Sequence, residues 1–234
     1  MENPLILLII LITLAMMPAL LTAETDQPSA TNSPISQPLI REGTLAVKLA
    51  GDLKLRTPEN EAEAEDLLST IQIAKAYVDA QREYAGKDRD GSGILQYAQR
   101  FLSHKGKKDG LYWEAAAGEV SSPLGPLFVQ ATEEGYTARK PGEEHRPYHG
   151  YYFKILKSQG SNAPGGERDY VIKGRMTGGF GLLAYPAGYG VSGIMTFMVN
   201  EDGIVCQKDL GPTTEEIAKA VTKYDPDTIW KQVK

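Results

Sequence analysis

The chain has 234 residues, of which 41% are hydrophobic and 24% are charged, and its formal net charge at pH 7 is −5. Its single cysteine excludes an intramolecular disulfide framework, and its three histidines exclude a histidine-rich metal protein. The 30 acidic residues outnumber the 25 basic ones, which gives no sign of a general nucleic-acid surface, so no nucleic acid is expected as a partner.

An uncharged and mostly apolar segment spans residues 5–23. Residues 5–17 have the length of the apolar core of a secretory signal, Pro18 then breaks the helix, and Ala23 suits a cleavage site. The whole segment also approaches the ~20 residues that an uncleaved membrane anchor needs. Residues 1–23 are therefore predicted to be a signal peptide, with a membrane anchor as the alternative. Both interpretations place the rest of the chain outside the cytoplasm.

Residues 24–38 are rich in Pro and Ser and contain almost no large apolar side chains. Such a composition cannot bury enough surface to offset the entropy of ordering, which predicts a flexible tether over residues 24–57. Within the tether, Leu45, Val47 and Leu49 alternate with smaller or polar residues, so one strand is expected there.

Thr57 and Pro58 form a helix-start signal, because a hydroxyl group caps the first backbone N–H groups and proline suits the first turn. Acidic residues follow where the positive end of the helix dipole favours them. An apolar stripe then continues as far as Gly86. A long helix is therefore predicted over residues 58–86, at the start of a single domain over residues 58–234.

A second amphipathic segment at residues 94–102 is expected to be helical as well. Later in the chain the hydrophobic period changes to two, which is typical of strands. Strands are predicted at residues 151–156, 180–185, 194–199 and 204–208, and short helices are predicted at residues 213–224 and 227–233. Helices followed by an antiparallel meander predict an α+β fold rather than a parallel α/β sheet.

The loop at residues 88–99 is the most informative polar segment. When it is aligned with a calcium-binding loop, Asp88, Asp90 and Ser92 supply oxygens at positions 1, 3 and 5, and glycine follows at position 6. Gln99 stands at position 12, where a bidentate glutamate is usual, so calcium would bind weakly. Calcium is the one cofactor that the sequence suggests. The favoured interpretation, however, is a turn whose Asp and Ser side chains cap the next helix.

Tyr148 and His149 stand just before a predicted strand and are candidates to line a cleft together with nearby carboxylates. Packing or solvent exposure is the favoured explanation for them. Pro147 lies between His145 and His149 and argues against a helix that would present both as zinc ligands. Cys206 lies in a predicted strand with no histidine nearby in sequence, so it is expected to be an inert small residue.

Gly188, Gly190 and Gly193 match the letters of a dinucleotide-binding motif. That motif needs a strand before it and a helix after it, whereas here a strand-like segment follows, so the glycines are predicted to permit turns. The lysine-rich loop at residues 105–108 is expected to be solvated only.

Several short strings in order carry a resemblance to a bacterial family. They lie at residues 76–84, 88–91, 97–100, 109–113, 147–152, 163–166, 178–180, 186–197 and 207–211. Over roughly residues 67–233 the chain resembles the family catalogued as domain of unknown function 2950, whose members are typically exported proteins of Gram-negative bacteria. The resemblance implies a periplasmic or cell-envelope location, and it brings no established activity.

A weaker likeness concerns the fold. A long helix followed by an antiparallel meander is similar to the head domains of type IV pilins and secretion pseudopilins. Residues 1–23 lack the processing glycine and the acidic residue of a pilin leader, so a pilin-like head is expected without membership of a filament.

Three functional hypotheses follow. The first is a non-catalytic structural or interaction domain of the cell envelope, with an envelope protein as its partner. The second is a calcium-modulated binding module that uses the loop at residues 88–99. The third is a periplasmic hydrolase that uses Tyr148, His149 and nearby carboxylates. Convergence of the Asp88, Asp90 and Ser92 oxygens would favour the second, and a carboxylate against His149 in a deep pocket would favour the third.

Overall fold

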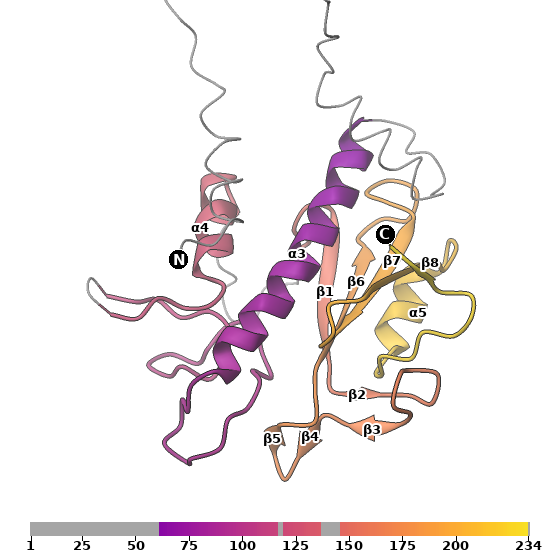
Figure 1. Cartoon of the computed structure of the whole chain (residues 1–234). Helices are drawn as coiled ribbons and strands as arrows, with labels where there is room; N and C mark the ends of the chain where they lie inside the picture. The colour runs from indigo at the N-terminus through magenta and orange to yellow at the C-terminus, as the bar shows by residue number, and fades with distance from the viewer. Residues whose placement is uncertain (1–60, 117–118, 137–145, 234) are drawn as a thin grey trace, which may run out of the picture. The chain divides into compact units, whose positions relative to one another are not determined.

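The computed structural model describes residues 61–116, 119–136 and 146–233 (Figure 1). Every described residue belongs to one compact unit. The predicted signal segment, the tether and its strand lie outside the described residues. Within the described part of the chain, no helix is both long enough and apolar enough to cross a membrane.

The described residues form three helices and nine strands. In chain order they are α3 (Glu61–Ala85), α4 (Gly125–Glu133), β1 (Tyr151–Leu156), β2 (Ser158–Gln159), β3 (Arg168–Asp169), β4 (Val171–Ile172), β5 (Arg175–Met176), β6 (Gly181–Pro186), β7 (Met195–Asn200), β8 (Val205–Asp209), α5 (Thr214–Ala220) and β9 (Lys231–Gln232). One antiparallel sheet has the order β1-β6-β7-β8-β9, and the pairs β2-β3 and β4-β5 form small separate sheets. The predicted α+β class is confirmed.

Strand β6 is buried along its whole length because the sheet is covered on both faces. Leu182 and Ala184 belong to the cluster that contains Tyr77 of α3, whereas Leu183 belongs to the cluster that contains Ala218 of α5. Figure 1 shows α3 and α5 on either side of the sheet. Successive strand residues point to opposite faces, so two covered faces require an uninterrupted apolar run, and the sequence of β6 supplies one.

Helix α3 connects to the next segment of the chain through a buried glutamine. Gln81 is fully buried, its Nε2 donates to the carbonyl of Ala98 at 2.8 Å, and its Oε1 accepts from the backbone N–H of Ala98 at 2.8 Å. Nε2 also donates to the hydroxyl of Tyr77 at 2.9 Å. The amide thus satisfies both backbone groups of Ala98 and joins α3 to the segment that follows residue 87.

The helix predicted at residues 94–102 is wrong. The backbone N–H of Tyr97 donates to the carbonyl of Met176 at 2.8 Å, and Gln81 takes both backbone groups of Ala98, so tertiary partners use the groups that a helix would need. Ile94 and Leu95, two residues of the expected apolar stripe, are 46% and 56% exposed.

The second of the short C-terminal helices is also wrong. Residues 231–232 form β9, which pairs with the outer edge of β8, and the N–H of Val233 donates to the carbonyl of Val205 at 2.8 Å. A seven-residue helix is marginal by itself, whereas the edge of β8 offers unpaired backbone groups.

Helix α4 was not expected from the sequence. Its Phe128 stacks on Tyr112 with ring centroids 3.9 Å apart.

Replacing the buried amide should destabilise the domain. We expect Gln81→Leu to lower the free energy of unfolding by about 2–5 kcal/mol, because the buried N–H and C=O of Ala98 lose their partners. Gln72→Leu, at an exposed position of the same helix, should change it by less than about 0.5 kcal/mol. Urea denaturation measures the free energy of unfolding of both variants. If Gln81→Leu loses no more stability than the control, the structural role given to the Gln81 amide is wrong.

Candidate functional site

A cleft of about 540 Å³ lies beside the C-terminal end of α3. The side chains around it include Arg89, Asp90, Gln96, Arg100, Lys107 and Asp109. The loop at residues 88–99, predicted as a calcium loop, therefore contributes one part of a larger feature. The lysine-rich loop at residues 105–108, expected to be solvated only, contributes another part.

The side chains of the loop at residues 88–99 shape its own backbone. The carboxylate of Asp88 accepts from the backbone N–H of Asp90 at 3.2 Å and of Gly93 at 2.7 Å. The carboxylate of Asp90 accepts from the backbone N–H of Ser92 at 3.1 Å. Aspartates that bond the backbone two residues later stabilise tight turns, which is why this segment folds back locally.

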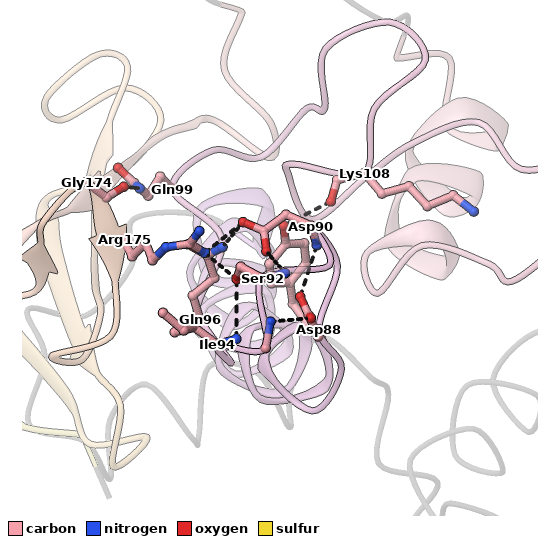
Figure 2. Close-up of polar contacts among 11 residues, drawn as sticks. Asp88, Asp90, Ser92, Ile94, Gln96, Gln99, Lys108, Gly174 and Arg175 are labelled. Carbon is pink, nitrogen blue, oxygen red and sulfur yellow. Dashed lines mark hydrogen bonds and ion pairs between the residues drawn. The ribbon is translucent and has the colours of Figure 1, made fainter.

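Arg175 of β5 reaches into this loop from the β4-β5 hairpin (Figure 2). Its Nη1 lies 2.7 Å from Oδ2 of Asp90 and 2.8 Å from the hydroxyl oxygen of Ser92. Gln96 also donates to Oδ2 of Asp90, at 2.9 Å. Hydrogen bonds from the hydroxyl and backbone of Ser92, together with Arg175, outweigh the slight desolvation of Asp90 and hold its pKa well below its ordinary value.

The predicted calcium ligands are brought together only in part. Asp88, Asp90 and Ser92 lie in one loop, but Gln99 donates to the carbonyl of Gly174 at 2.8 Å, on the neighbouring hairpin (Figure 2). A cation on Asp90 and Ser92 would have to replace the guanidinium of Arg175. In the described part of the chain, no three His, Cys, Asp or Glu side chains are grouped so that they could hold a metal ion. Calcium binding stays a prediction.

His104 and Asp109 form a second polar group beside the cleft. Nδ1 of His104 lies 2.6 Å from Oδ2 of Asp109, and the backbone N–H of His104 donates to Oδ1 at 2.9 Å. Arg100 Nη1 lies 2.6 Å from Nε2 of the same ring. A neutral imidazole with its proton on Nδ1 satisfies both partners. Burial acts to raise the pKa of Asp109, but the bonds from His104 outweigh it and the pKa is lowered.

Tyr148 and His149 lie in a different part of the molecule, at the entry to β1. The backbones of Tyr148 and Tyr151 bond each other reciprocally at 2.9 and 3.0 Å, so His149 and Gly150 form the tip of a two-residue hairpin turn. Both tip residues have positive φ, +44° and +68°, as a type I′ turn requires. Histidine tolerates this conformation better than most residues with a Cβ.

Two carboxylates flank the His149 ring. Nε2 lies 3.0 Å from Oε2 of Glu134, just after α4, and Nδ1 lies 3.9 Å from Oδ1 of Asp66 in α3. The three side chains are only 24–30% exposed. Burial raises the pKa of Asp66, with His149 opposing it, and burial together with the Glu134 charge raises the pKa of Tyr148. The Tyr148 hydroxyl is buried, and the Glu134 side chain lies close enough to it to contribute to the raised pKa.

Other candidate features behave as structural elements. Gly188, Gly190 and Gly193 lie in the connection between β6 and β7, where the N–H of Gly190 donates to the carbonyl of Gly193, so they permit turns as predicted. Cys206 is buried in β8, and burial raises the pKa of its thiol. That environment disfavours the thiolate that a nucleophile needs.

Residues 57–233 match the family described as "Protein of unknown function (DUF2950)". The chain belongs to the DUF2950 family. The family resemblance inferred from the short strings is therefore confirmed. No curated protein and no solved structure matches this DUF2950 protein, and its likeness to pilin heads stays a prediction.

The role of Arg175 can be tested with calcium. If the loop binds the cation at all, Arg175→Gln should bind it more tightly than wild type, because the oxygens of Asp90 and Ser92 lose their competing guanidinium. Lys173→Gln removes a positive charge from the same hairpin and serves as the control. Calorimetry with millimolar CaCl₂ measures both. Absence of heat in wild type and in Arg175→Gln would end the calcium hypothesis.

The raised pKa of Asp66 predicts a pH-dependent stability. A carboxyl group with a raised folded pKa stabilises the fold below its ordinary pKa of 3.8, and this contribution is lost as the pH rises through the folded value. Asp66→Asn should therefore be more stable than wild type at neutral pH, by less than about 1 kcal/mol for a partly exposed group. The gain should vanish near pH 3. Denaturation of wild type and Asp66→Asn across this pH range measures the difference, and a gain that persists at pH 3 would contradict the prediction.

Proposed function

We propose that this DUF2950 protein is an exported protein of the cell envelope whose domain acts by binding rather than by catalysis. The cleft bounded by Arg89, Asp90, Arg100 and Asp109 is its contact surface. An envelope partner is the binding target. A pilin-like role in assembly is part of the same proposal, and the export expectation derives from residues 1–23 and from the family resemblance.

The protonation chemistry of the cleft carries the proposal. A general acid or base works best when its pKa lies near the operating pH, so catalytic carboxyl groups usually have raised pKa values. Asp90 and Asp109, the carboxyl groups of the cleft, have lowered pKa values instead, because Ser92, Arg175 and His104 stabilise their charged forms. Both are fixed anions at neutral pH, which suits orientation and binding better than proton transfer.

The hydrolase alternative has one specific observation in its favour. Glu134 lies against Nε2 of His149 and Asp66 lies near Nδ1, so a histidine is oriented by carboxylates. Asn-Gly is favoured at a type I′ turn, so His149→Asn preserves the turn while removing the ring. Loss of an esterase or glycosidase activity in His149→Asn, with unchanged stability, would support this alternative over the binding proposal.

Site-specific cross-linking in cells tests the binding proposal. A photoreactive amino acid at position 96, in the cleft, should form a discrete adduct, and the adduct should fractionate with the cell envelope. The same substitution at position 72, on the exposed side of α3, should form none. Adducts of equal yield at both positions, or adducts in the cytoplasmic fraction alone, would refute the proposal.

A further inference from the structure

We propose that the cleft beside the C-terminal end of α3 binds a ligand that carries two or more adjacent oxyanion groups, phosphate or carboxylate, through Arg89, Arg100 and Lys107. This inference rests on the proposed binding function and names the chemistry of its ligand. Three independent features of the cleft lead to it: its charge, the orientation of its guanidinium groups, and its size.

Among the described residues, Arg89, Arg100 and Lys107 form no salt bridge with a carboxylate, although the charge of Arg100 helps to lower the pKa of Asp109. The guanidinium of Arg89 donates to the backbone carbonyls of Tyr84 and Glu83. That of Arg100 contacts the ring of His104, and no ion pair is recorded for Lys107. Five cations elsewhere among the described residues do pair with carboxylates: Arg82 with Asp79, Arg168 with Glu201, Lys208 with Asp227, Lys219 with Glu215 and Lys223 with Glu167. The cleft therefore concentrates unpaired positive charge.

The carboxylates of the cleft do not cancel this charge. Asp90 is paired with Arg175, which approaches from β5, and Asp109 is held by His104. Arg89, Arg100, Lys107 and Lys108 thus outnumber the carboxylates of the lining, and one of those carboxylates is already compensated. A cleft with an excess of one sign of charge attracts ligands of the opposite sign.

Arg89 is also held in place before a ligand arrives. Its guanidinium lies over the ring of Tyr84 at 4.9 Å and over the ring of Trp113 at 5.1 Å. A guanidinium that is already oriented loses less conformational freedom when it binds, and its planar donors suit phosphate and carboxylate oxygens. The Gln96 side chain supplies an amide close by, and it is already bonded to Asp90.

The size of the cleft argues for more than a single small ion. Its volume of about 540 Å³ falls within the 300–1,000 Å³ that is usual for small-molecule sites. Four cations that line one such space are best matched by several linked anionic groups. Tripolyphosphate and tricarballylate, one with phosphate and one with carboxylate groups, are therefore suitable probes.

Calorimetry of the purified full-length protein with each probe tests the inference at low salt. We expect tripolyphosphate, tricarballylate or both to bind, and we expect Arg100→Gln combined with Lys107→Gln to weaken binding about tenfold or more. Lys87→Gln, an exposed residue outside the lining, should change the affinity less than twofold. Preference for one probe identifies the anionic group and supports the inference.

Two outcomes would overturn it: no binding of either probe at millimolar concentration, or equal weakening by Lys87→Gln and by the double variant. The calorimetry and the cross-linking experiment test different statements, so either one can fail while the other succeeds. Adducts at position 96 without probe binding would retain the binding function and reject the oxyanion ligand. Probe binding without adducts would retain the ligand site and reject an envelope partner at the cleft.

Discussion

The arrangement of this domain depends on the hydrogen bonds between the buried amide of Gln81 and the backbone of Ala98. A polar side chain inside the core must find its partners there, and both polar groups of this amide do. Ala98 is thereby held against α3, and the adjacent Tyr97 bonds Met176 of β5. Arg175, the neighbour of Met176, consequently lies opposite Asp90, so the wall of the cleft follows from one buried contact.

Two polar regions of the molecule differ in how they treat their carboxyl groups. In the cleft, Asp90 and Asp109 are stabilised as anions by donors that contact them directly. Beside the β1 turn, burial raises the pKa of Asp66 despite the nearby His149 ring. The cleft therefore has the properties of a fixed binding surface, whereas beside His149 burial decides the direction of the pKa shift of Asp66.

Four of the nine described strands were predictable, because their signal is local. Segments 151–156, 180–185, 194–199 and 204–208 coincide with β1, β6, β7 and β8 to within one residue. Both faces of β6 are covered, so every residue of this strand is buried, and the resulting run of mostly apolar side chains is visible in the sequence. The helices predicted at residues 94–102 and 227–233 are wrong for the opposite reason. Their backbone groups are taken by partners far away in sequence, Gln81, Met176 and β8.

The sequence by itself determined the α+β class, the main strands, the tight turn of residues 88–93, the strand position of Cys206 and the family. Each of these rests on periodicity, on side chains that bond their own backbone, or on strings of adjacent residues. Only the tertiary structure decided that Arg175 joins Asp90, that Glu134 and Asp66 flank His149, and that unpaired cations share one cleft. These contacts join segments that are up to 85 residues apart. Their geometry depends on how the whole chain packs, and no local pattern in the sequence encodes it.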